Sequence, residues 1–149
     1  TRTDRRAMIR AMEEQAAFAT RGHQAILEEL TGRSFEEIHF TGGAAKGRLW
    51  PQIVADVLGV RVHIPEVKES TALGAALFAG LGAGLYDTLD EVAQRINRIE
   101  RTVEPDAAAG AAYDEAFARW QVVYPRMLSL AEDGLMAPMW WPAGPPLFW

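Results

Sequence analysis

Residues 36–60 read EEIHFTGGAAKGRLWPQIVADVLGV, and two adjacent glycines join a short apolar run to an amphipathic stretch. Ile38 and Phe40 lie on one face of residues 36–41, which predicts a short strand. A helix is predicted over residues 48–58, because its apolar residues recur at steps of one, three or four. They are Leu49, Ile53, Val54 and Val57. The quoted stretch therefore predicts a strand, a turn and a helix in succession.

The glycine pair between the strand and the helix has two possible explanations. Gly42 and Gly43 either make a tight connection or let a ligand lie against bare backbone. In an α/β unit, ligands bind beyond the carboxyl ends of the strands, where this turn lies. N–H groups over residues 45–48 are expected to be unpaired donors at a helix start, with Lys46 and Arg48 adding positive charge. The glycine pair alone leaves both explanations open.

Similar patterns predict the other elements of the chain. Helices are expected over residues 4–30, 70–81, 89–100 and 106–132, and a second strand over residues 60–64. Gly32 and Gly59 are predicted to end helices, and Ser70 to cap the start of one. The order predicts two parallel strands with right-handed crossovers, an α/β fold with few strands. The helix over residues 70–81 is rich in alanine and glycine, which permits close packing or ligand approach. Residues 137–149 are rich in proline and aromatic residues and predict no regular element.

Composition excludes several classes of function. The chain has 149 residues, of which 49% are hydrophobic and 23% charged, as expected of a globular domain. A net charge of −5 argues against a general nucleic-acid binder. With no cysteine, and with His23, His39 and His63 far apart, no metal site is predicted. No stretch of membrane-spanning length or secretory signal is visible, so a cytoplasmic protein without membrane contact is expected.

Residues 40–86, FTGGAAKGRLWPQIVADVLGVRVHIPEVKESTALGAALFAGLGAGLY, resemble the C-terminal domain of the FGGY carbohydrate kinases. The segments ERTVEPD (100–106) and YDEAFARWQVVYPRMLSLAEDGL (113–135) are most similar to the autoinducer-2 kinase branch of that family. The resemblance implies part of a ribonuclease H-like domain of the actin and hexokinase type. It also implies that residues 1–103 form the C-terminal half of the nucleotide-binding domain. Residues 104–149 would then be a C-terminal helix with a proline-rich and aromatic tail.

The same resemblance implies that the chain binds ATP through the glycine turn. In this family the backbone of such a turn lines the adenine and ribose side of the nucleotide, which implicates Gly42, Gly43 and Ala44. Lys46 and Gly47 complete the expected site. The family often has Ser or Asn at the position of Gly47, so a polar side-chain contact there is in doubt.

Residues for catalysis are not expected within this chain. Phosphoryl transfer in such kinases uses a carboxylate base, a glycine-and-threonine turn and Mg²⁺, and no Asp-x-Gly-Thr sequence is present. Asp56 and Asp87 are predicted to be solvated or to cap helices. The base, the acceptor pocket and the ligands of Mg²⁺ are therefore expected outside this chain, which alone is predicted to be inactive.

The resemblance predicts the nucleotide side of a kinase that phosphorylates a small polyol or ketose, in particular the autoinducer-2 precursor. Another FGGY pentulose or polyol kinase, a non-catalytic nucleotide-binding module, and a purely structural domain are the alternatives. In the hexokinase-type fold that this chain resembles, the strand over residues 36–41 is expected to lie beside a strand that this chain lacks. Its free edge is therefore expected to pair with a missing N-terminal part or with a second copy of the chain.

Overall fold

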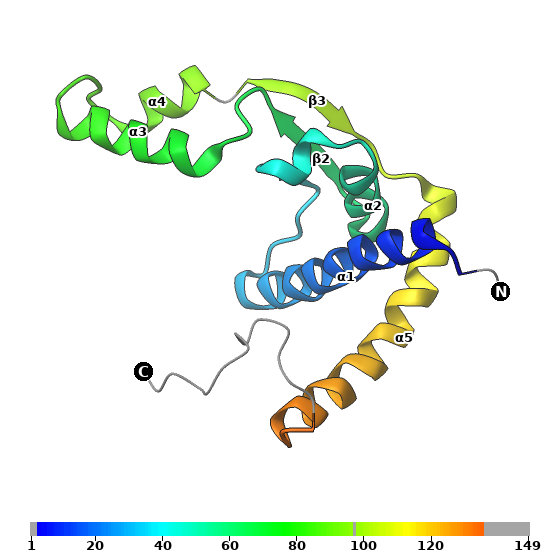
Figure 1. Cartoon of the computed structure of the whole chain (residues 1–149). Helices are drawn as coiled ribbons and strands as arrows, with labels where there is room; N and C mark the ends of the chain where they lie inside the picture. Colours follow the sequence, from blue (N-terminus) through cyan, green and yellow to red (C-terminus); the bar gives the residue numbers. More distant parts are fainter. Residues whose placement is uncertain (1–2, 97, 136–149) are drawn as a thin grey trace. The chain divides into compact units, whose positions relative to one another are not determined.

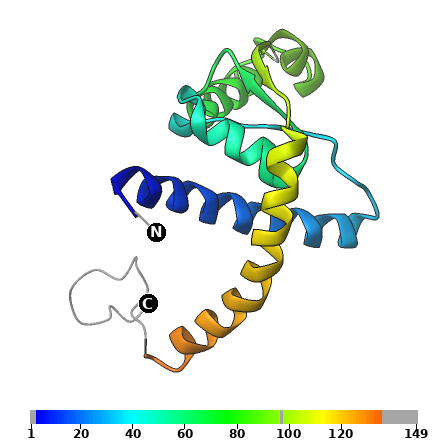
Figure 2. The same cartoon turned by 90° about the vertical axis from the view of Figure 1, so that its right-hand side faces the viewer.

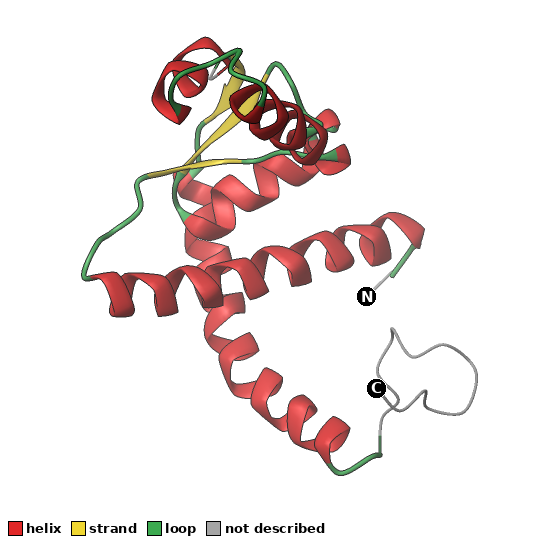
Figure 3. Ribbon diagram, turned by 90° about the vertical axis from the view of Figure 1, so that its left-hand side faces the viewer, coloured by secondary structure: helices red, strands yellow, loops and turns green. Residues whose placement is uncertain are grey.

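The computed structural model describes residues 3–96 and 98–135. Its sheet consists of β1 (Glu37–His39), β2 (Arg61–Pro65) and β3 (Ile99–Val103), in the order β1-β2-β3 (Figure 1; Figure 3). The helices are α1 (Arg5–Thr31), the short 3₁₀ helix η1 (Gly43–Lys46), α2 (Leu49–Leu58), α3 (Ser70–Gly82), α4 (Leu89–Ile96) and α5 (Ala107–Glu132).

The chain divides into two compact units, residues 1–113 and residues 114–149. Within the second unit, the rings of Phe117 and Trp120 stack with centroids 5.6 Å apart, and those of Trp120 and Tyr124 at 4.6 Å. The predicted tail over residues 137–149 lies outside the described residues. The functional boundary expected after residue 103 stays a prediction.

The sheet contains the predicted parallel pair. β1 and β2 are parallel, with Ile38 opposite Val62, and α2 connects them and packs against β2 (Figure 2). Gly32 and Gly59 end α1 and α2 with φ angles of 64° and 69°, as predicted. The strand–helix–strand crossover is therefore confirmed.

The predicted total of two strands is wrong, because β3 adds an antiparallel strand on the other side of β2. In this pair Val62 lies opposite Val103 and Ile64 opposite Arg101. The sequence predicted a helix as far as residue 100, whereas α4 ends at Ile96. Val92, Ile96 and Ile99 continue a helical spacing, which hid the change of structure. The β-branched residues that follow fit a strand, and the free edge of β2 supplies its partner.

The core of the first unit lies between α2 and the sheet. Ile53 and Val57 of α2 and Val62 and Ile64 of β2 are almost fully buried. Such side chains contribute about 1.5–3 kcal/mol each through burial. The core thus fixes α2 against the sheet, and with it the turn that precedes α2.

Asp56 is a buried acidic residue in this core. Its Oδ1 accepts hydrogen bonds from Gln52 Nε2 and from the backbone N–H of Asp106, both at 2.8 Å. The expectation that Asp56 is solvated or caps a helix is replaced by a different role: its buried carboxylate holds the segment before α5 against α2. Asp87 is exposed.

In the part of the chain that the structure describes, the outer edge of β1 has no partner strand. On the inner edge, Phe40 N–H donates to His63 O at 2.9 Å. Backbone groups alternate in direction along a strand, so those of Glu37 and His39 point to the open edge. An open edge of this kind pairs readily with another chain.

We predict that the amide protons of Glu37 and His39 exchange slowly only when another strand pairs with β1. That strand would come from polypeptide outside residues 1–149 or from a second copy of the chain. Hydrogen exchange followed by NMR at increasing protein concentration measures this, with the amides of the doubly paired β2 as the protected control. A monomer in which Glu37 and His39 exchange as slowly as β2 would show that β1 is wrongly placed at an open edge.

Candidate functional site

The glycine turn leaves β1 and enters η1 through an unusual backbone conformation. Gly42 has φ 81° and ψ −171°, which residues with a side chain rarely adopt. In the next residues, Ala45 N–H donates to Gly42 O at 3.2 Å and Gly47 N–H donates to Ala44 O at 3.3 Å. The expectation of unpaired donors over residues 45–48 is therefore wrong for Ala45 and Gly47, because the tight 3₁₀ turn uses both.

Gly43 faces open space. A Cβ atom added at Gly43 would meet no atom within 4 Å, and the φ angle of this residue lies outside the left-handed region. A Cβ on Gly47 would lie 3.6 Å from Ala44 O, an ordinary contact. The fold thus does not require glycine at either position, and Gly43 leaves room for a group to approach its backbone.

The start of the turn is attached to the connection between β2 and α3. Gly42 N–H donates to Lys68 O at 2.7 Å, and the hydroxyl groups of Thr41 and Ser70 form a hydrogen bond at 3.0 Å. The predicted capping role of Ser70 is wrong, because Glu69 occupies the N-cap position of α3 without a side-chain hydrogen bond. Ser70 instead holds the residue before the glycine pair.

Lys46, an expected site residue, forms an ion pair in this structure. Its Nζ lies 2.7 Å from Glu69 Oε1, and both side chains are more than half exposed. The hydrogen bond from Lys46 lowers the pKa of the Glu69 carboxyl below its usual value. An exposed pair of this kind is weak, so a bound anion can compete with Glu69 for the ammonium group.

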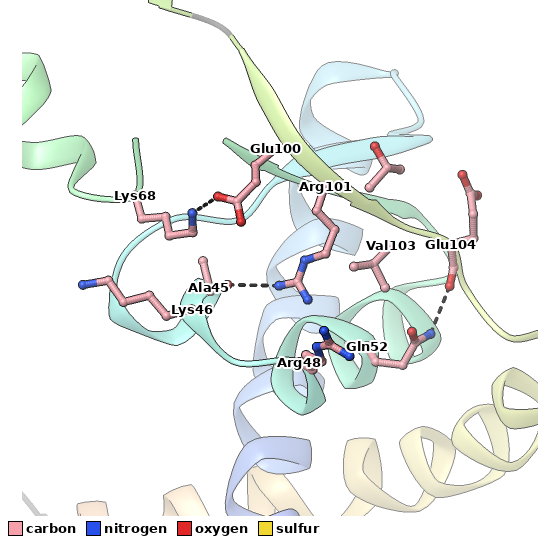
Figure 4. Close-up of a pocket in the computed structure, with 10 residues that line it drawn as sticks. Ala45, Lys46, Arg48, Gln52, Lys68, Glu100, Arg101, Val103 and Glu104 are labelled. Atoms are coloured by element: carbon pink, nitrogen blue, oxygen red, sulfur yellow. Dashed lines mark hydrogen bonds and ion pairs between the residues drawn. The ribbon is translucent and has the colours of Figure 1, made fainter. Parts of the chain in front are cut away.

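Arg101 of β3 contacts the end of the turn, and the sequence analysis missed it. Its guanidinium nitrogen Nη2 donates to Ala45 O at 3.2 Å (Figure 4) and to Gly47 O at 2.8 Å. The signal was hidden because residues 89–100 were assigned to a helix, which left Arg101 in an apparent loop.

A cleft of about 660 Å³ lies between the turn, the start of α2, the segment after β2, and β3 (Figure 4). Its lining residues are Ala45, Lys46, Arg48, Gln52, Lys68, Glu100, Arg101, Thr102, Val103 and Glu104. Lys68 forms an ion pair with Glu100 across it. Basic side chains outnumber acidic ones on its walls, so the cleft suits a ligand that carries negative charge.

The small residues of α3 have different surroundings. Gly80 is buried, and a Cβ atom there would lie 2.7 Å from Cε2 of Tyr86. At Gly74 an added Cβ would meet nothing within 4 Å, and Ala72 and Ala76 are exposed. Close packing therefore accounts for Gly80. Gly74, Ala72 and Ala76 do not pack closely against other residues in the part of the chain described here.

Two further features bear on the class of protein. Across residues 3–96 and 98–135, no three His, Cys, Asp or Glu side chains are grouped so that they could hold a metal ion. Nor does any helix within those ranges have the length and apolar character needed to cross a membrane.

Comparison with known sequences identifies the family. The sequence profile of the C-terminal domain of the FGGY family of carbohydrate kinases matches residues 1–83. Autoinducer-2 kinase from Yersinia enterocolitica is 43% identical over 133 residues, which cover 89% of this chain and 25% of that protein. The Yersinia pestis (strain Pestoides F) autoinducer-2 kinase is 44% identical with the same coverage. The chain thus spans about a quarter of the length of these relatives.

Solved structures agree with the sequence comparison. Xylulose kinase from Rhodospirillum rubrum superposes with a TM-score of 0.68 at 27% identity, over 87% of this chain and 26% of that one. Glycerol kinase from Plasmodium falciparum with ADP gives a TM-score of 0.66 at 25% identity, over 83% and 24%. These neighbours confirm the predicted α/β fold of the actin and hexokinase type. By both comparisons, the chain belongs to the FGGY family of carbohydrate kinases and carries its C-terminal domain.

Proposed function

We propose that this chain is the nucleotide side of an ATP-dependent carbohydrate kinase. The observation that carries the proposal is the 43–44% identity to autoinducer-2 kinases over 133 residues. One of its structural neighbours is a glycerol kinase with ADP. The enzyme would transfer the γ-phosphate of ATP to a hydroxyl of a small polyol or ketose in the cytoplasm, where ATP is available.

The glycine turn is the proposed contact with ATP. Gly42, Gly43, Ala44, Lys46 and Gly47 would line the adenine and ribose side of the nucleotide. Open space above Gly43 supports this assignment, because a flat base can approach the backbone only where no side chain intervenes. The basic walls of the adjoining cleft suit an anionic ligand.

Residues 1–149 would bind and orient the nucleotide without taking part in proton transfer. Kinases of this class place a base at the acceptor hydroxyl, and Mg²⁺ neutralises charge on the transferred phosphoryl group. The described residues offer no cluster that fits a metal ion. We therefore assign the base, the acceptor pocket and the Mg²⁺ ligands to polypeptide outside residues 1–149.

The acceptor that we favour is the autoinducer-2 precursor, a linear dihydroxypentanedione. Relatives named for that activity share 43–44% identity with this chain, whereas the xylulose and glycerol kinase structures share 25–27%. Another pentulose or polyol kinase is the second candidate, and a non-catalytic nucleotide-binding module is the third. The gene sequence upstream of Thr1 distinguishes the non-catalytic module from the two kinases, because only a kinase needs the Asp-x-Gly-Thr turn.

We predict that residues 1–149 alone phosphorylate none of these acceptors, because the base and the phosphate turn are missing. Each acceptor is incubated with ATP and Mg²⁺, and ADP formation is measured. The acceptors are the dihydroxypentanedione, xylulose and glycerol. The longer chain that contains residues 1–149 should turn over the dihydroxypentanedione with the highest kcat/KM. Turnover by residues 1–149 alone would overturn the assignment of catalysis to other residues, and a preference for xylulose or glycerol would overturn the acceptor.

We predict that Gly43→Val in the longer chain weakens ATP binding about 10- to 100-fold, because the new methyl groups occupy the position of the base and such overpacking costs about 1–3 kcal/mol. ATP affinity is measured by calorimetry. The variant should fold, since a Cβ at Gly43 meets no atom within 4 Å. Gly82→Val is the matched control, because its surroundings are equally open. Normal ATP binding by folded Gly43→Val would show that the glycine pair serves only as a turn.

A further inference from the structure

Arg101 holds the end of the glycine turn from a different element of the fold. Its Nη2 donates to the carbonyl oxygen of Ala45 at 3.2 Å (Figure 4) and to that of Gly47 at 2.8 Å. These two carbonyls lie at the point where η1 gives way to α2. One charged nitrogen therefore fixes the direction of two peptide groups at the exit from the turn.

The register of β3 explains why Arg101 can reach the turn. Arg101 lies opposite Ile64, whose side chain is buried. Neighbouring residues in register point to the same face of a sheet. The side chain of Arg101 therefore leaves the sheet on the face that α2 covers, half-buried beside the turn.

The turn needs this support because its own bonds are weak. η1 is a four-residue 3₁₀ helix, a geometry with poor hydrogen bonds, and Gly42, Gly43 and Gly47 carry a large backbone entropy. Bonds to Lys68 O and Ser70 hold only its start. The ion pair of Lys46 is exposed and weak.

We propose that Arg101 is a positioning residue for the nucleotide-binding turn. Its bonds to Ala45 O and Gly47 O keep the backbone at Gly43 in the shape that receives ATP. A preformed turn avoids the entropy cost of ordering on binding, so its loss weakens nucleotide affinity while the reacting groups stay unchanged. This inference rests on the proposed function, since it assumes that the turn binds ATP.

The test compares three variants of the longer chain. Arg101→Met removes the donors and keeps an aliphatic stem. Arg101→Lys restores a cationic donor on a shorter stem. Arg61→Met is the matched control. Arg61 of β2 lies opposite Glu37 of β1, and both side chains point to the face of the sheet opposite to that of Arg101.

Arg101→Met should raise the KM and Kd for ATP about tenfold, the order expected from losing bonds to a charged donor. The acceptor KM should stay within about twofold of wild type, because the proposed function assigns the acceptor pocket to polypeptide outside residues 1–149. Amide exchange at Ala45 and Gly47 should become faster. Arg101→Lys should recover part of the ATP affinity, and Arg61→Met should behave as wild type.

The outcomes separate this inference from the proposed function. The comparison applies when wild type binds ATP and Gly43→Val does not. In that case, normal ATP binding by Arg101→Met, with unchanged amide exchange at Ala45 and Gly47, would show that the positioning role is wrong. An equal rise in both KM values together with a lower Tm would assign Arg101 to general stability and overturn the inference. If Arg101→Met does not fold, Arg101→Lys decides, with an intermediate ATP KM and unchanged acceptor KM expected. Failure of wild type to bind ATP would instead overturn the proposed function.

Discussion

The backbone of Gly42 is the constraint on which the rest of the site depends. With φ 81° and ψ −171°, it turns the chain sharply out of β1 and directs its N–H at Lys68 O, 2.7 Å away. That bond ties the turn to the segment between β2 and α3. A residue with a Cβ at this position would be strained by about 1–3 kcal/mol, and relief of that strain would weaken the hydrogen bond to Lys68 O. The open backbone of Gly43 is therefore a consequence of the conformation of its neighbour.

Much of the fold could be predicted because its signals are local. The glycines that end α1 and α2 and the crossover between β1 and β2 follow from spacing and turn chemistry within a few residues. β3 could not be predicted in this way. Ile99 continues the helical spacing of α4, and only pairing with β2, more than thirty residues earlier in the chain, makes this segment a strand.

The candidate site was predictable only in part, for a related reason. Gly42 is visible in the sequence because glycine alone readily meets its conformational requirement. The groups that hold the turn are Lys68 O, the hydroxyl of Ser70 and the guanidinium of Arg101, and they come from distant parts of the chain. Of these only Arg101 carries a charge that could have drawn notice, and its strand was itself missed.

The first unit also exposes apolar side chains of α1 and one edge of its sheet. Met12 and Leu30 of α1 are 71% and 76% exposed, and the outer edge of β1 has no partner strand within the described residues. These features fit a chain that spans about a quarter of the length of its relatives. The core between α2 and the sheet is nonetheless closed, with Ile53 and Ile64 almost fully buried.

The contrast between the closed core and the exposed surfaces bears on the glycine turn. Its supports come from α3, from β3 and from the segment between β2 and α3, which all lie within residues 1–113, and none of these hydrogen bonds involves the open edge of β1. The shape of the turn is therefore set by the closed part of the unit. If the turn binds ATP as proposed, polypeptide that covers the exposed surfaces has no need to build the nucleotide-binding turn. Under that proposal, such polypeptide has only to bring the base, the phosphate turn and the acceptor to a surface that is already formed.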